Sequence, residues 1–258
     1  MSTKPTISVI IPCYNSSRYI DNTLNSVVNQ SQEIEKIIVI DDHSKDVDKI
    51  TKIISSYKVR FKFIKFEIIK NKKNFGPGKC RNIAWSQVDT EYIAFIDSDD
   101  IWSRNKLKKQ MNIFEDFNVD LVFTAKNNLS KTQKAGIVSL KKMLFKNIIP
   151  LSSVLIKSKV KFRFAENYYA EDYYLWLIML CNNLKLYYLN QVLCKNNNNL
   201  FPNQKHLSNN TFRMFLYTQL SLSKVYKKRS NLFFFILIAQ IFEIFKFFLR
   251  YIFKIIKL

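Results

Sequence analysis

Short apolar runs alternate with longer amphipathic stretches through the first two-thirds of the chain. The short runs are rich in β-branched and aromatic residues, as strands are, and lie at residues 7–11, 36–40, 61–66, 92–96 and 120–124. The stretches between them carry apolar residues at helical spacing and lie at residues 19–30, 46–57, 78–88 and 104–117. Because strand and helix alternate strictly, the sequence predicts an α/β fold with a mostly parallel sheet flanked by helices.

The pattern is less regular beyond residue 140. Residues 139–145 and 170–180 favour helices, and residues 152–156 favour a strand. Residues 195–210 are polar and rich in Asn, which is typical of a loop.

The last part of the chain has a different composition. Residues 232–242 are almost wholly apolar, and charged residues then recur every three or four positions: Glu243, Lys246, Arg250, Lys254 and Lys257. A helix would align them in one stripe, while an uncharged run of 11 residues is shorter than the ~20 that span a bilayer. We therefore predict a domain at residues 1–222 and an amphipathic, membrane-associating tail at 223–258. The alternative is a helix that packs on the protein or on a second copy, giving an oligomer through the C-terminal helices.

Composition and charge narrow the functional classes. Of the 258 residues, 48% are hydrophobic, which excludes general disorder. The net charge is +21, and only four of the 20 acidic residues lie beyond residue 140. Such a basic C-terminal half attracts nucleic acid, an anionic membrane or a phosphate-rich substrate. Nucleic acid is the least favoured, because the aromatic residues lie inside apolar runs rather than among Lys and Arg.

The four cysteines lack CxxC spacing and follow no secretory leader. Disulfides and a zinc site are therefore not expected, and we predict a reducing, cytoplasmic compartment.

Polar segments follow the predicted strands. In parallel sheets the ligand lies beyond the carboxyl ends of the strands, so "PCYN" (12–15), "DDHS" (41–44), "NFGPGKCRN" (74–82) and "DSDD" (97–100) should face one crevice. Carboxylates one residue apart can hold a hard divalent cation, although "DSDD" could also be a solvated turn or a helix cap. The glycine-rich segment could approach an anion or be an ordinary junction between loop and helix.

Taken in order, these segments resemble the family 2 glycosyltransferases, inverting enzymes with the Rossmann-like GT-A fold. The resemblance covers about residues 6–200. The segments that carry it are "SVIIPCYN" (8–15), "IVIDDHSKD" (38–46), "NFGPGKCRNIAW" (74–85), "YIAFIDSDDIW" (92–102) and "EDYYLW" (171–176).

The resemblance implies a role for each matching position. The residues expected around the nucleotide-sugar are Pro12, Tyr14, Asn15, Asp41, Asp42, Gly76, Arg81, Asp97 and Ser98. Asp41 or Asp42 would accept the uracil imide hydrogen. Asp99 would hold Mn²⁺ or Mg²⁺, with Asp97 on the metal or on the ribose.

The same resemblance implies that Asp172 is the catalytic base, with Glu171 in support. One carboxylate suffices to deprotonate an acceptor hydroxyl in an inverting transfer. The structural alternative is that both acids stabilise the first turn of a helix. His206 has a thinner match to a His-containing loop of the family, and His43 is expected to be a turn residue.

The resemblance implies transfer of a hexose from a UDP-sugar to a saccharide acceptor. A basic C-terminal half and a membrane-seeking tail favour a lipid-linked acceptor, in bacterial O-antigen, capsule or lipooligosaccharide synthesis at the inner face of the cell membrane. Two other readings remain: a metal-dependent phosphatase or phosphotransferase that uses "DSD", and a non-catalytic basic protein on the membrane surface.

Overall fold

A single mixed sheet forms the centre of the computed structural model, which describes residues 5–129, 133–197 and 210–256, with side chains to residue 252. Its nine strands follow the order β3-β2-β1-β4-β8-β6-β9-β5, and β7 pairs with β9. The strands are β1 (Ile7–Cys13), β2 (Lys36–Asp41), β3 (Lys65–Lys70), β4 (Tyr92–Phe95), β5 (Asp100–Trp102), β6 (Leu121–Lys126), β7 (Gly136–Ile137), β8 (Leu155–Lys157) and β9 (Leu186–Asn196).

Strand directions match the expected fold class. Strands β3, β2, β1 and β4 are mutually parallel, and β6 is parallel to β9. Antiparallel pairs join β8 to β4 and β6, and join β5 and β7 to β9. The α/β prediction with a mostly parallel sheet is therefore confirmed.

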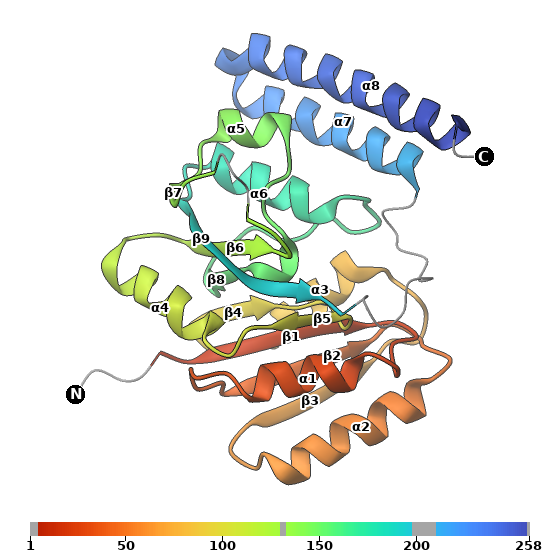
Figure 1. Cartoon of the computed structure of the whole chain (residues 1–258), viewed down its shortest axis with the longest axis vertical. Helices are drawn as coiled ribbons and strands as arrows, with labels where there is room; N and C mark the ends of the chain where they lie inside the picture. Colours follow the sequence, from red (N-terminus) through yellow and green to blue (C-terminus); the bar gives the residue numbers. More distant parts are fainter. Residues whose placement is uncertain (1–4, 130–132, 198–209, 257–258) are drawn as a thin grey trace.

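Helices cover both faces of the sheet (Figure 1). They are α1 (Ile20–Val28), α2 (Val47–Arg60), α3 (Pro77–Trp85), α4 (Lys106–Asp116), α5 (Leu140–Phe145), α6 (Glu171–Cys181), α7 (Thr211–Lys228) and α8 (Phe233–Ile256), with 3₁₀ turns at Leu151–Ser153 and Ser230–Leu232. Side chains of β1 alternate between the two layers. Val9 and Ile11 join the core beneath α1, α2 and α4, and Ile10 joins the core beneath α3 and α6. Burial on both faces explains why these strands read as continuous apolar runs.

Two expected strands are displaced the most from their expected bounds. The strand expected at 61–66 runs from Lys65 to Lys70. Helix α2 continues to Arg60, Phe61 stacks on Tyr57 with ring centres 5.9 Å apart, and a turn closes where the Ile64 N–H donates to the Phe61 oxygen. In the strand expected at 152–156, the first residues form a 3₁₀ turn and β8 begins at Leu155.

Helices α7 and α8 lie side by side at one end of the molecule, next to α5 and α6 (Figure 1). Phe215 stacks on Phe247 with ring centres 4.7 Å apart, and Gln219 Nε2 donates to the Gln240 oxygen. Ile236 and Ala239 are buried against the domain. The domain boundary expected at 222/223 falls within α7, and the division into a domain and a tail stays a prediction.

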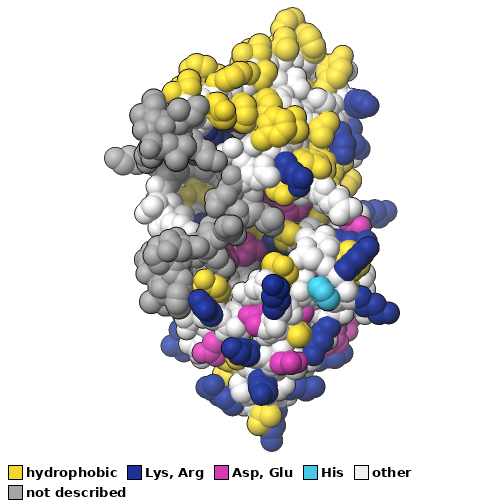
Figure 2. All heavy atoms as spheres, turned by 90° about the vertical axis from the view of Figure 1, so that its right-hand side faces the viewer, with side chains coloured by type: hydrophobic (Ala, Val, Ile, Leu, Met, Phe, Trp, Pro, Cys, Tyr) yellow, Lys and Arg dark blue, Asp and Glu magenta, His cyan; other side chains and the backbone are white. Residues whose placement is uncertain are grey.

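Much of α8 nevertheless faces outward. Phe234 is 74% exposed and Phe245 is 58% exposed, and apolar side chains gather at this end of the surface (Figure 2). By length and composition alone, residues 230–252 could cross a membrane, with a mean hydropathy of 2.2. The segment was expected to be too short to span a bilayer because only the uncharged run at 232–242 was considered. The helix continues beyond that run to Ile256.

Candidate active site

The carboxyl ends of β1, β2 and β4 lie together, as expected for a site in a parallel sheet. Cys13 pairs with Asp41 in the β1–β2 ladder, and Ile10 pairs with Phe95 in the β1–β4 ladder. Hydrogen bonds join the loops that follow β1 and β2: the Asn15 N–H donates to Ser44 Oγ, and the Lys45 N–H donates to Asn15 Oδ1, both at 2.9 Å. Asn15 takes the left-handed conformation (φ 51°), which Asn tolerates better than most residues.

Asp42 organises the glycine-rich segment. Its Oδ1 accepts from the Phe75 N–H and from Asn71 Nδ2, and its Oδ2 accepts from the Gly76 N–H, at 2.8–2.9 Å. Gly76 has φ 83°, a region that favours glycine, and it leads into Pro77 at the first position of α3. Both oxygens of Asp42 are therefore occupied in shaping this loop.

Asp41 has a different environment. Its Oδ2 accepts from the Ser44 N–H at 3.1 Å, while its buried Oδ1 has no hydrogen-bond partner among the described residues. An unsatisfied buried carboxylate oxygen is costly, and a ligand donor could reach this one only if the residues that cover it move. Asp41 and Asp42 were both expected near the uracil base, and only Asp41 has a carboxylate oxygen that accepts no hydrogen bond from the described residues.

Arg81 connects two acidic segments that lie far apart in the sequence. It is buried in α3, and its Nη2 lies 2.7 Å from Asp97 Oδ1 while its Nη1 lies 2.7 Å from Glu171 Oε1. Burial opposes a charge on the guanidinium, but Asp97 and Glu171 outweigh this effect and raise the pKa of Arg81. The loop after β4 is thereby tied to the start of α6.

Gly78 permits this approach. A Cβ at Gly78 would lie 3.0 Å from both the Ala165 oxygen and Glu171 Cγ. Glu171 therefore packs closely against α3 at a position where a Cβ would be crowded. The glycine-rich segment was expected either to approach an anion or to join a loop to a helix, and spacing along the chain does not reveal the contact of Gly78 with Glu171.

The three aspartates after β4 have distinct partners. Asp97 is paired with Arg81, and its side chain is 36% exposed. Asp99 is half-buried, and its backbone oxygen accepts from the Asn197 N–H. Asp100 is buried in β5, where its Oδ2 lies 2.6 Å from Lys126 Nζ. Asp100 thus joins β5 to the end of β6, while Asp97 joins the loop after β4 to α3.

A divalent ion is compatible with this donor set. Within the described ranges, no group of three His, Cys, Asp or Glu side chains could hold a metal by itself. Mg²⁺ and similar hard cations commonly use one or two carboxylates, with water and substrate phosphates completing the shell. Asp97 and Asp99 could supply those carboxylates.

Asp172 lies in the first turn of α6, in a setting that raises its pKa to about 7. Burial is the main cause, and the charge of Glu171 adds to it. Hydrogen bonds from the Tyr173 N–H and from Asn147 Nδ2, together with Arg81, act in the opposite direction. The preceding residue, Ala170, has φ 57°, a left-handed conformation that costs a non-glycine residue roughly 1–2 kcal/mol. A carboxylate with a pKa near neutrality is suited to accept a proton.

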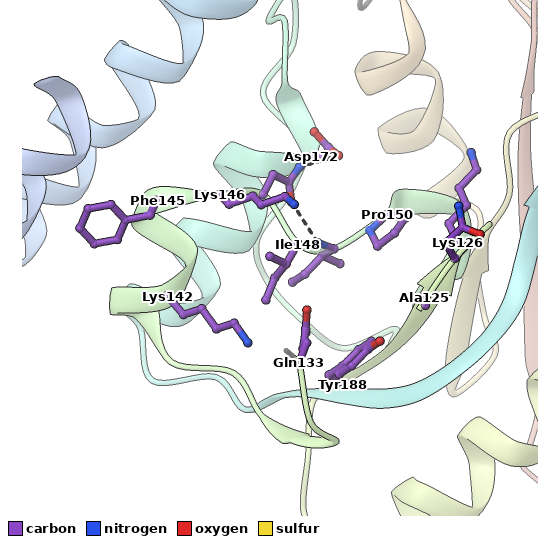
Figure 3. A pocket seen from close by; sticks show the side chains of 13 residues that line it. Ala125, Lys126, Gln133, Lys142, Phe145, Lys146, Ile148, Pro150, Asp172 and Tyr188 are labelled. Carbon is purple, nitrogen blue, oxygen red and sulfur yellow. Dashed lines mark hydrogen bonds between the residues drawn. The ribbon is translucent and has the colours of Figure 1, made fainter. Parts of the chain in front are cut away.

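A cavity of about 600 Å³ borders Asp172 (Figure 3). Lys126, Lys142 and Lys146 line it, so the cavity is basic. Gln133 and Tyr188 lie across from Asp172 in the close-up view. The Gln133 Nε2 is buried and has no hydrogen-bond partner in the described part of the chain. The cavity therefore presents the cations Lys142 and Lys146 near the candidate base.

The other expected residues are placed as follows. Pro12 is half-buried in β1, Tyr14 is exposed directly after it, and the Ser98 oxygen accepts from Thr23 Oγ1. His43 is exposed in a bend (φ 65°), and His206 lies outside the described residues. The residues that follow β1 and β2, the aspartates that follow β4, and Glu171 and Asp172 of α6 all lie at one end of the sheet. Their individual roles stay predictions.

Sequence comparisons find glycosyltransferases. Residues 8–135 match the model of the family described as "Glycosyl transferase family 2". An uncharacterized glycosyltransferase of Methanocaldococcus jannaschii is 29% identical over 88% of this chain and 82% of that protein. The UDP-Glc:alpha-D-GlcNAc-diphosphoundecaprenol beta-1,3-glucosyltransferase WfgD of Escherichia coli is 28% identical over 69% of this chain and 70% of that protein.

Solved structures share the fold. TarS 1-349 of Staphylococcus aureus in complex with UDP-GlcNAc has a TM-score of 0.70 at 22% identity, over 86% of this chain and 66% of that chain. The mannosyltransferase PcManGT of Pyrobaculum calidifontis in complex with GDP-Man and Mn²⁺ has a TM-score of 0.68 at 15% identity, over 88% of this chain and 65% of that chain. The expected GT-A fold is thereby confirmed.

Proposed function

The chain belongs to glycosyl transferase family 2, and from that premise we propose that it is an inverting hexosyltransferase with a UDP-sugar donor and a divalent metal ion. We propose a saccharide acceptor linked to a lipid, in bacterial O-antigen, capsule or lipooligosaccharide synthesis at the inner face of the membrane. The names of the relatives support this choice: WfgD uses UDP-Glc and a diphosphoundecaprenol-linked sugar, and TarS binds UDP-GlcNAc.

The observation that carries the proposal is the position of Asp172. It borders the basic cavity, and Glu171 beside it is tied through Arg81 to Asp97. A base on one side of the donor and diphosphate-binding groups on the other is the arrangement that an inverting transfer requires. The acceptor oxygen attacks the anomeric carbon from the face opposite the diphosphate.

The transfer can be written in terms of bonds. Asp172 takes the proton of the acceptor hydroxyl while the acceptor oxygen forms its bond to the anomeric carbon. The bond from that carbon to the diphosphate oxygen breaks, and UDP leaves with the electron pair. A bound Mn²⁺ or Mg²⁺, held by Asp99 and Asp97, would neutralise charge on the departing diphosphate.

The nucleotide would lie over the ends of β1 and β2. Tyr14, which is exposed, could cover the base, and Asp41 Oδ1 is the acceptor available for the imide N–H of uracil. Because Asp41 is only 2% exposed, binding must shift the loop that covers it. Arg81 acts by positioning Asp97 and Glu171, since both of its terminal nitrogens are already paired.

A thermal-shift panel with UDP-, GDP- and CDP-sugars in the presence of Mn²⁺ tests the donor class. We expect UDP-sugars to stabilise the chain. Asp99→Asn should lower their affinity at least tenfold, and Asp89→Asn, at an exposed acid away from the site, should leave it unchanged. Asp172→Asn should abolish transfer while UDP binding remains. Release of phosphate from sugar phosphates without sugar transfer would favour a phosphatase instead.

A further inference from the structure

A second cavity, of about 310 Å³, adjoins the first and lies between α6, α7 and α8. The two cavities share Lys146, Asn147 and Asp172 in their walls. Asp172 therefore stands at the boundary between them. A ligand that enters from the side of α8 would reach the candidate base directly.

The walls of the second cavity are rich in cations. Lys246 and Arg250 lie one helical turn apart on α8, and Lys146 follows α5. Lys246 is paired with Glu243 and also donates to the Phe145 oxygen, so much of its charge is already used. Lys146 and Arg250 make no ion pair with any described residue. The walls also hold the acids Glu243, which pairs with Lys246, and Asp172, so Lys146 and Arg250 leave a small surplus of positive charge that favours an anionic ligand.

Apolar side chains line the same cavity. Met214 and Phe215 come from α7, and Phe247 comes from α8. Beyond the cavity, the outward face of α8 carries exposed aromatic residues at the apolar end of the molecule (Figure 2). An anion bound here would lie next to a surface suited to hydrocarbon.

We propose that this second cavity binds the phosphate groups of the lipid-linked acceptor, with Arg250 and Lys146 as their cationic partners. This inference rests on the proposed function and assigns the acceptor a path: its lipid along α8, its phosphates between α7 and α8, and its sugar in the first cavity. A guanidinium binds phosphate oxygens through two parallel N–H bonds, which gives Arg250 the larger share.

The path also limits the length of the acceptor. Because the two cavities meet at Asp172, the attacking hydroxyl and the phosphates occupy neighbouring sites. The acceptor sugar chain between the phosphate and the attacking hydroxyl should therefore be short.

Binding of farnesyl diphosphate to the full chain tests the proposal. The measurement is made by calorimetry with saturating UDP and Mn²⁺, so that the donor site is already filled. We expect Arg250→Gln and Lys146→Gln each to weaken binding about tenfold. Lys227→Gln removes an equal charge from an exposed position on α7 that lines neither cavity, and it should change affinity less than twofold.

Two further ligands separate the sources of phosphate. Inorganic diphosphate should bind at least tenfold more weakly than farnesyl diphosphate. The affinity for vesicles of phosphatidylglycerol should fall by the same factor in Arg250→Gln, Lys146→Gln and Lys227→Gln. Any of three results would overturn the inference. Lys227→Gln could weaken the binding of farnesyl diphosphate as much as Arg250→Gln and Lys146→Gln do, inorganic diphosphate could bind as tightly as farnesyl diphosphate, or farnesyl diphosphate could fail to bind. UDP binding is measured in parallel, and its absence would instead contradict the proposed function.

Discussion

Gly78 supports the site because it has no Cβ, which lets Glu171 pack closely against α3. Replacing Gly78 with Ala would place a Cβ 3.0 Å from Glu171 Cγ and from the Ala165 oxygen, so Glu171, which pairs with Arg81, would have to shift by a few tenths of an ångström. We expect Gly78→Ala to lower the free energy of unfolding by ~1–3 kcal/mol, the usual cost of overpacking, and to reduce transfer at least tenfold. Urea unfolding and an initial-rate assay measure the two effects.

Ser86→Ala is the matched control for this prediction. Ser86 is exposed at the end of the same helix, and its loss should change stability by less than about 0.5 kcal/mol. Full activity in Gly78→Ala would show that the position of Glu171 does not matter for transfer.

The pKa of Asp172 gives a pH dependence with a definite sign. A base must be deprotonated, and the pKa of this carboxyl is raised to about 7 by burial and by Glu171. The rate of transfer should therefore fall about tenfold for each pH unit below 7 and level off above 8. A pH profile of kcat/KM measures this, because kcat/KM reports the pKa values of the free enzyme.

Asn147→Ala provides a second, directional check on Asp172. The Asn147 amide donates to Asp172 and stabilises the charged form, so its removal should raise the pKa and shift the profile to higher pH. A profile that stays flat from pH 5 to 8, or one that shifts downward in this variant, would show that another group accepts the proton.

Elements with strong local patterns were predictable from sequence. Strands β1, β2 and β4 are buried on both faces and give unbroken apolar runs, while α1, α2 and α4 are covered on one face and give helical spacing. The convergence of their loops followed from topology alone. Strand β5 has three residues, and β9 mixes Asn190, Gln191 and Lys195 with apolar residues, so neither had a clear local signal.

Contacts between distant elements could not be read from the sequence. The pair of Arg81 with Glu171 joins α3 to α6, and spacing along the chain says nothing about it. The resemblance gave roles to Asp97 and Asp99 and none to Asp100. Asp100 turns into the sheet because β5 pairs with β9 and brings it to Lys126. The partners of each acid depend on the packing of whole elements.

The pair of Lys126 with Asp100 holds the edge strand β5 to β6, and its loss should destabilise the fold in a pH-dependent manner. Burial is the main cause that raises the pKa of Asp100 to about 7, and Lys126 opposes this shift. Lys126→Met would raise that pKa further. The stability lost should therefore be small at pH 5, where Asp100 is already protonated, and larger at pH 8.

Urea unfolding at pH 5 and at pH 8 measures this difference. Lys108→Met, at an exposed position of α4, removes the same charge without touching Asp100 and should lose less than about 0.5 kcal/mol at either pH. Equal losses at the two pH values for Lys126→Met would mean that Asp100 does not titrate in the folded chain.

The whole molecule is asymmetric along its length. The parallel strands and the candidate nucleotide residues occupy one part, and α7 and α8 form an apolar, basic end beside the acids of α6 (Figure 1). If that end lies on an anionic membrane, the candidate base stands between the donor site and the lipid surface. The orientation would bring a membrane-bound acceptor to a donor that arrives from solution.

Flotation with phosphatidylglycerol vesicles tests this orientation. A variant with Phe234, Phe245 and Phe248 changed to Ser removes exposed apolar area from α8 and leaves the buried Ile236 and Ala239 in place. We expect it to lose vesicle binding at least tenfold with little change in Tm, because burial in the interface contributes about 25 cal/mol per Å² of apolar surface. Val59→Ser with Phe63→Ser, two exposed apolar residues around the end of α2, is the control and should bind normally.

Binding of the unaltered chain should also weaken as salt rises, since an interfacial helix depends partly on attraction between Lys or Arg and the headgroups. Resistance to high salt and to alkaline extraction would instead show that α8 crosses the membrane.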